Sequence, residues 1–160
     1  MASPTDLTHV VTCFLLRADR GHDEILLVRR SERVRTYRGA WAGISGYLEP
    51  GVTPLEQAYT ELREETGLAR EDVRLLRAGA PLTFEDTTLG QAWTVHPFLF
   101  AIRAPDRIQT DWEATAHQWI APAELAALPT VPKLAEALAA VYPARGDHAP
   151  DAGETPNARA

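Results

Sequence analysis

The chain has 160 residues, 45% of them hydrophobic, which suits one domain with a proper apolar core. Its formal net charge of −6 at pH 7 argues against nonspecific binding to nucleic acid. A single cysteine excludes an internal disulfide framework, and because the sequence shows neither a signal peptide nor a stretch long enough to span a bilayer, we expect a cytoplasmic protein without a membrane partner.

The first part of the chain is predicted to form two paired strands and a basic loop. Apolar runs at residues 9–17 and 24–30, joined by a turn that contains glycine, indicate a β-hairpin, and a short strand is expected at residues 41–45. The loop before that short strand contains five arginines and a tyrosine: Arg29, Arg30, Arg33, Arg35, Arg38 and Tyr37. This loop is either an ordinary solvated segment or a phosphate-binding one, and the sequence leaves both open.

Residues 54–66 are predicted to form the first helix. Thr53 can cap free backbone N–H groups, and Pro54 suits the first helical turn, where its missing donor is harmless. Gly67 can take the left-handed conformation that commonly ends a helix. The helical period then gathers three glutamates on one face, three and four positions apart: Glu61, Glu64 and Glu65.

This acidic face is the feature that predicts chemistry. Like charges at such spacings destabilise a helix by about 0.2–0.5 kcal/mol per pair, and a bound cation would relieve the repulsion. Carboxylates with no nearby histidine or cysteine form a hard oxygen site, which suits Mg²⁺ or Mn²⁺ better than zinc, and magnesium in turn suggests a phosphate ligand. The alternative is an ordinary solvated face whose charge is balanced by Arg63.

The second part of the chain completes an α/β pattern. Strands and then helices are expected, in order, at residues 73–83, 91–102, 117–121, 122–128 and 132–141. Pro97 inside the second of these strands suggests a bulge or an edge position. We expect an α/β/α sandwich with a mixed β-sheet, formed by a single domain at residues 1–142. Residues 143–160 cannot bury apolar area and are expected to be a disordered tail.

Residues 46–68 resemble the Nudix box, in which glycine, glutamate, arginine and further glutamates recur at fixed spacing. Seven positions are in register: Gly46, Glu61, Leu62, Glu64, Glu65, Gly67 and Leu68. Two positions depart, because Val52 stands where the box has a glutamate and Thr60 where it has an arginine. Losing an acid and a base together leaves the site's charge balanced.

The resemblance implies a Nudix-like sandwich and a pyrophosphohydrolase that needs Mg²⁺, or Mn²⁺, and cleaves a nucleoside diphosphate linked to another moiety. Glu61, Glu64 and Glu65, with the backbone carbonyl of Ser45, would hold the metal, and Glu61 and Glu64 would be catalytic. The alternative, motivated by Val52 and Thr60, is a catalytically degenerate Nudix domain that acts as a nucleotide-binding or sensor module.

The resemblance also implies a general base outside the box, on the loop before the last strand. Glu113 lies in that loop, Asp111 is the next candidate, and Glu85 or Asp86 could approach from another loop. For a small nucleotide substrate, the expected contacts come from the basic loop and its end: Arg35, Tyr37, Arg38 and Trp41. A homodimer is left open.

Overall fold

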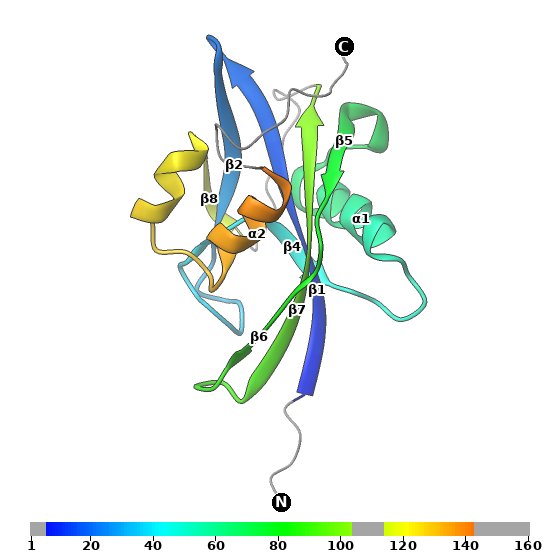
Figure 1. Cartoon of the computed structure of the whole chain (residues 1–160), viewed down its shortest axis with the longest axis vertical. Helices are drawn as coiled ribbons and strands as arrows, with labels where there is room; N and C mark the ends of the chain where they lie inside the picture. The colour runs from blue at the N-terminus through cyan, green and yellow to red at the C-terminus, as the bar shows by residue number, and fades with distance from the viewer. Residues whose placement is uncertain (1–5, 104–113, 143–160) are drawn as a thin grey trace, which may run out of the picture.

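The computed structural model describes residues 6–103 and 114–142, which form an α/β/α sandwich around one mixed sheet (Figure 1). The strands are β1 (Asp6–Asp19), β2 (His22–Arg30), β3 (Trp41–Ala42), β4 (Ile44–Tyr47), β5 (Val73–Ala78), β6 (Leu82–Asp86), β7 (Gln91–Ile102) and β8 (Ala114–Ile120). The helices are α1 (Pro54–Thr66) and α2 (Leu134–Val141), with short 3-10 helices η1 (Arg70–Asp72) and η3 (Pro122–Ala127). The predicted fold class is therefore confirmed. The predicted tail, Asp111 and Glu113 lie outside the described residues, and the extent of the domain stays a prediction.

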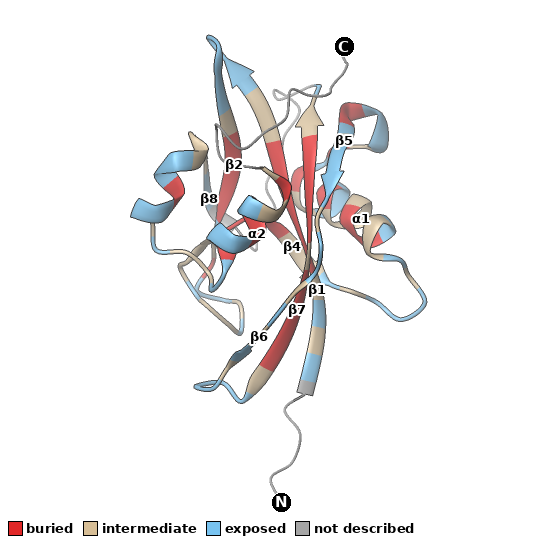
Figure 2. Cartoon of the chain, in the orientation of Figure 1, coloured by how far each residue is buried: buried red, intermediate tan, exposed pale blue. Residues whose placement is uncertain are grey.

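The sheet carries an apolar core on each face because successive side chains of a strand point in opposite directions. On β1, Cys13 and Leu15 pack on the α1 side with Leu62. Phe14, between them in sequence, packs on the α2 side with Leu138. Figure 2 shows the buried residues concentrated in the middle of the long strands, whereas the hairpin tips are exposed. No helix in the described ranges is long and apolar enough to cross a membrane.

Strand β7 lies inside the sheet, between β1 on one side and β5 and β6 on the other. The expected edge position is therefore wrong, and its parallel register with β1 runs past Pro97 without a break. A bulge does occur, but on the partner strand β5, between Leu75 and Arg77. Pro97 falls opposite the gap between β5 and β6, where Gly79 donates its N–H to the Pro97 carbonyl at 2.9 Å. Its missing N–H therefore interrupts no pairing with either strand.

The predicted limits of helix α1 are confirmed, and so are their physical causes. The hydroxyl of Thr53 accepts a hydrogen bond from the Glu56 N–H at 3.2 Å, and Glu56 reaches back to complete a capping box. At the other end, Gly67 has a φ of 77° and donates its N–H to the Arg63 carbonyl at 2.9 Å. These local signals place the glutamates of α1 at defined positions on the helix surface.

The expected strand at residues 41–45 is divided in two at Gly43. Strand β3 pairs with β2, whereas β4 pairs with β1, so the chain passes from one neighbour to another at this glycine. A Cβ atom at Gly43 would lie 2.9 Å from the carbonyl oxygen of Cys13, which is closer than a side chain allows. The break therefore brings residues 44–47 alongside β1 and under α1.

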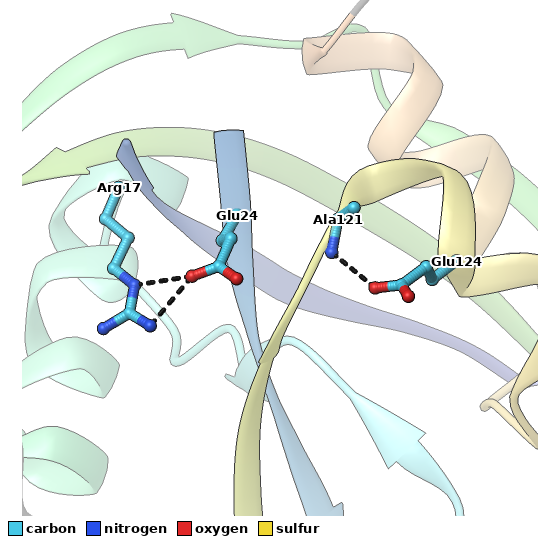
Figure 3. A network of polar contacts seen from close by, with 4 residues as sticks. All are labelled: Arg17, Glu24, Ala121 and Glu124. Carbon is cyan, nitrogen blue, oxygen red and sulfur yellow. Dashed lines mark hydrogen bonds and ion pairs between the residues drawn. The ribbon is translucent and has the colours of Figure 1, made fainter. Parts of the chain in front are cut away.

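Figure 3 shows two polar contacts, one between β1 and β2 and one at the start of η3. Arg17 of β1 donates to the Glu24 carboxylate of β2 at 2.9 Å and 2.8 Å. After β8, the Glu124 carboxylate accepts the N–H of Ala121 at 2.8 Å and starts η3. The following segment then pairs with Trp41, which donates its N–H to the Pro129 carbonyl at 2.9 Å. This pairing brings the start of α2 next to the loop that follows β2.

Candidate active site

A cavity of about 740 Å³ lies on the sheet face that carries α2. Side chains of β1 and β7 that share this face line the cavity: Val10, Thr12, Trp93 and Val95. Its walls come from the arginine-rich loop, from β4, from the glutamates of α1 and from the start of α2. Cavities of about 300–1,000 Å³ are typical of small-molecule sites.

One wall of this cavity is acidic. Helix α1 contributes Glu61, Glu64 and Glu65, and Ser45 and Glu49 line the cavity from β4 and the segment after it. The Ser45 hydroxyl is turned toward the Thr12 hydroxyl, at 3.1 Å, and the Gly43 carbonyl, at 3.2 Å. Within the described residues no three acidic, histidine or cysteine side chains already form a metal cage. The fold nevertheless brings oxygen donors, the kind of ligand that a hard cation prefers, to line the same cavity.

The Glu61 carboxylate has closely defined surroundings. A Cβ atom at Gly46 would overlap its carboxylate carbon and both oxygens, so the carboxylate packs directly against the glycine backbone. Gln57, one turn earlier on α1, donates from Nε2 to the Glu61 carboxylate at 3.0 Å. The other end of the Gln57 amide accepts the Glu49 N–H at 3.1 Å. The glycine that opens the sequence motif is therefore required for space.

Replacing Gly46 with alanine should displace the Glu61 carboxylate. Gly46 has no positive φ, so the new methyl group would strain the site through contact alone. We expect Mg²⁺ affinity, measured by isothermal titration calorimetry, to fall by about 10–100-fold, the usual cost of disturbing the groups around a metal ligand. Gly51→Ala is the control, because its φ of 79° strains the backbone while nothing lies near the added methyl group. That variant should lose stability and keep its metal affinity, and equal affinities for Gly46→Ala and wild type would contradict the prediction.

The acidic wall also acts on the core behind it. Cys13 is fully buried under α1, and burial raises the pKa of its thiol well above the usual value. The negative charges of Glu65 and Glu61 raise this pKa further. The same charges favour a cation in the cavity beside them.

Other side chains that line the cavity are basic or aromatic. The cationic ones are Arg30, Arg33, Arg35 and Lys133, and the aromatic ones are Tyr37, Tyr47, Phe84 and Trp93. Tyr47 stacks on Trp93, with ring centroids 6.3 Å apart. Trp93 is 7% exposed, and its indole N–H has no hydrogen-bond partner within the described part of the chain. Arginines and stacked rings are the groups that bind phosphates and flat heterocycles.

Tyr37 joins the arginine-rich loop to β6. Its hydroxyl donates to the Asp86 carboxylate at 2.7 Å, and burial followed by this hydrogen bond raises the pKa of Tyr37 to about 12. Asp86 also accepts hydrogen bonds from the hydroxyl and the N–H of Thr88. These contacts, with Thr88 first and Tyr37 second, lower the pKa of Asp86. Neither Asp86 nor Glu85 lines the cavity.

The structure brings together some of the predicted substrate contacts and not others. Arg35 and Tyr37 line the cavity. Arg38 and Trp41 do not: Arg38 donates to the Val34 carbonyl at 2.6 Å, and Trp41 packs against the core on the α2 side. Glu113, the predicted base, lies outside the described residues.

The sequence did not single out three residues that line the cavity, Tyr47, Trp93 and Lys133. It also gave no indication of Gln57, which does not line the cavity but donates a hydrogen bond to Glu61. Tyr47 directly follows the motif glycine, and this adjacency could have identified it. Trp93 and Lys133 carry no comparable local signal, because their positions depend on how β1 pairs with β7 and how α2 meets the sheet.

The two positions that depart from the motif are placed away from the cavity. Thr60 donates its hydroxyl to the Glu56 carbonyl of its own helix at 3.2 Å. Val52 donates its N–H to the Glu49 carbonyl at 3.2 Å. Neither residue lines the cavity. Neither therefore replaces a charged motif side chain next to the predicted metal ligands.

Comparisons with known proteins agree with this architecture. The putative nudix hydrolase 1 of Caenorhabditis elegans is 27% identical over 115 residues, which are 71% of this chain and 29% of that longer protein. The crystal structure of a C. elegans Ap4A hydrolase binary complex matches with a TM-score of 0.70 and 20% identity, covering 82% of this chain and 92% of that one. The MutT protein from Methanosarcina mazei matches with a TM-score of 0.67 and 23% identity, covering 83% and 90%. These two structures share the fold.

The family comparison covers nearly the whole described chain. A model of the NUDIX domain matches residues 7–141, from the first residues of β1 to the last residue of α2. This range contains the motif at residues 46–68 and every described wall of the cavity. The resemblance of the motif is thereby confirmed, and the protein belongs to the NUDIX domain family.

Proposed function

We propose that this protein is a divalent-metal-dependent hydrolase that cleaves the pyrophosphate bond of a nucleoside diphosphate linked to another moiety. One observation carries the proposal: carboxylates, arginines and aromatic rings line a single cavity. A nucleotide needs both kinds of charged group, because a metal held by the carboxylates and the cationic side chains would together neutralise its phosphates.

The oxygen donors on the acidic wall fit Mg²⁺ or Mn²⁺. Glu61, Glu64 and Glu65 would hold the ion, with the backbone carbonyl of Ser45 as a further donor. When bound, the metal supplies positive charge to the phosphates and lowers the pKa of the attacking water. The protein's own part is to present these donors together, although two positions of the motif have lost their charge.

The basic and aromatic side chains that line the cavity would bind and orient the substrate. Arg33, Arg35 and Lys133 can neutralise phosphate charge, and the exposed ring of Tyr47, which stacks on Trp93, can pack against a base. Positioning the phosphates and neutralising their charge provides much of the catalysis in phosphoryl transfer. The proton of the attacking water would be taken by a carboxylate, and Glu113 remains our assignment for that base.

A second candidate function is a nucleotide-binding or sensor module without turnover. The side chain of Thr60 favours it, because this residue replaces the motif arginine and is engaged with its own helix. Val52 favours the same function, because it stands where the motif has a glutamate. Against it, all three glutamates remain on one cavity wall, although their mutual repulsion costs helix stability when no metal is bound.

One assay separates the two functions. The protein is incubated with nucleoside triphosphates, ADP-ribose, sugar nucleotides and dinucleotides, with and without Mg²⁺, and released mononucleotide and phosphate are measured. The panel includes Ap4A, because the C. elegans protein that shares the fold is an Ap4A hydrolase. Mg²⁺-dependent release from any member supports the hydrolase. A ligand that raises the melting temperature without any product supports the module, because binding to the native state alone stabilises it.

A further inference from the structure

We infer that Gln57 positions the Glu61 carboxylate in this protein, in which positions 52 and 60 lack the charged pair of the motif. The inference rests on the proposed function only in taking Glu61 as a metal ligand. Gln57 itself does not line the cavity, so its part would be to hold a ligand.

The contacts of Gln57 are those of a bridge. Its side chain is 2% exposed, and both ends of its amide are hydrogen-bonded. Nε2 donates to Glu61 Oε2 at 3.0 Å, and Oε1 accepts the N–H of Glu49 at 3.1 Å. Because residues four apart share a helix face, Gln57 lies directly beside Glu61. A buried amide that loses a hydrogen-bond partner lowers the stability of the fold. Burial therefore favours keeping both hydrogen bonds of Gln57.

This bridge joins the two halves of the acidic wall. Glu61 belongs to α1, whereas Glu49 belongs to the segment that connects β4 to α1, and both line the cavity. On its other side, the Glu61 carboxylate is limited by the backbone of Gly46. The carboxylate is therefore held between a glycine on β4 and an amide on α1.

The residues at the departed motif positions do not supply this contact. Thr60 gives its hydroxyl to the Glu56 carbonyl, and Val52 has an apolar side chain. A neutral amide can orient a carboxylate without placing a positive charge next to the cation site. Gln57 thus explains how the wall keeps its geometry after the motif lost its acid and its base together.

The test measures metal binding directly. Gln57→Met keeps the volume and burial of the side chain but removes both hydrogen bonds. We expect Mn²⁺ affinity, measured by titration calorimetry and by the electron paramagnetic resonance of free Mn²⁺, to fall by about 10–100-fold. The Mg²⁺ concentration for half-maximal activity should rise by the same factor. Restoring the motif in this background, with Val52→Glu and Thr60→Arg, should recover most of the lost affinity.

Thr66→Val is the matched control. Thr66 is also polar and fully buried on α1, and its hydroxyl bonds to the Leu62 carbonyl, away from Glu61. This variant should lose stability and keep its Mn²⁺ affinity. If Gln57→Met binds Mn²⁺ as wild type does while Glu61→Gln binds it weakly, the inference is overturned. A wild-type protein that binds Mn²⁺ but hydrolyses nothing would refute the proposed function alone, and one that binds no Mn²⁺ would refute both.

Discussion

Glu64→Gln and Glu65→Gln are each expected to lower the rate of hydrolysis by at least about a hundredfold, while the fold stays intact. Each change removes one charged oxygen donor from the acidic wall of the cavity, and disturbing even the surroundings of a metal ligand costs about 10–100-fold. The measurement is the steady-state rate on the best substrate of the panel, taken over a range of Mg²⁺ concentrations. The loss should be largest at low Mg²⁺.

The same variants should behave differently without metal. Removing one of the like charges relieves repulsion worth about 0.2–0.5 kcal/mol per pair, and Glu65 also lies near the negative end of the helix dipole. The melting temperature in EDTA should therefore stay level or rise by about one degree. Glu71→Gln is the control, because this exposed carboxylate on η1 does not line the cavity. Unchanged rate and unchanged Mg²⁺ dependence in Glu65→Gln would exclude Glu65 from the metal site.

Glu113→Gln should reduce kcat by about 10²–10⁴-fold, the usual contribution of a general base, while metal binding is largely kept. The acidic limb of the pH–rate profile should disappear with it, since that limb reports protonation of the base. The matched measurement is Mn²⁺ affinity on the same protein, which separates a base from a ligand. A fall in both kcat and affinity would assign Glu113 to the metal instead.

Besides Asp111, the next candidate and also outside the described residues, three described carboxylates compete for this role. Asp86 already accepts hydrogen bonds from Tyr37 and Thr88 that lower its pKa, which makes it a poor proton acceptor, and we expect Asp86→Asn to keep most of kcat. Glu85 also lies off the cavity wall. Of the described carboxylates that line the cavity, Glu49 is the one outside the predicted metal ligands. If Glu113→Gln keeps full kcat while Glu85→Gln, Asp86→Asn or Glu49→Gln loses it, the base is on that other segment.

Arg35 and Arg38 make different contacts although they belong to the same cluster of arginines. Both lie in the loop after β2, and composition alone treats them alike. In the fold, Arg35 faces the cavity, whereas Arg38 turns back to the Val34 carbonyl of its own loop. The difference comes from the conformation of the loop, in which Tyr37 has a φ of 54° and Arg30 donates to the Thr36 carbonyl at 2.9 Å. No pattern in the sequence predicts that conformation.

Helix α1 and its acidic face can be predicted from the sequence, because every signal involved is local. Thr53 and Pro54 start the helix, Gly67 ends it, and the helical period places the glutamates together. Pro97 shows where such local reasoning fails. Proline is usually excluded from interior strands, but here its missing donor faces a gap that exists only because β5 and β6 are separate strands.

The surroundings of the acidic face depend on tertiary packing. The carboxylate of Glu61 packs against Gly46 because β4 pairs with β1 beneath the helix. Trp93 stacks with Tyr47 because β7 pairs with the same strand, β1. Such contacts join segments far apart in the chain, so their geometry depends on strand register and on the packing of the helix against the sheet. Local propensity contains neither quantity. For that reason the sequence did not predict the cavity with its basic and aromatic lining, nor the bridge made by Gln57.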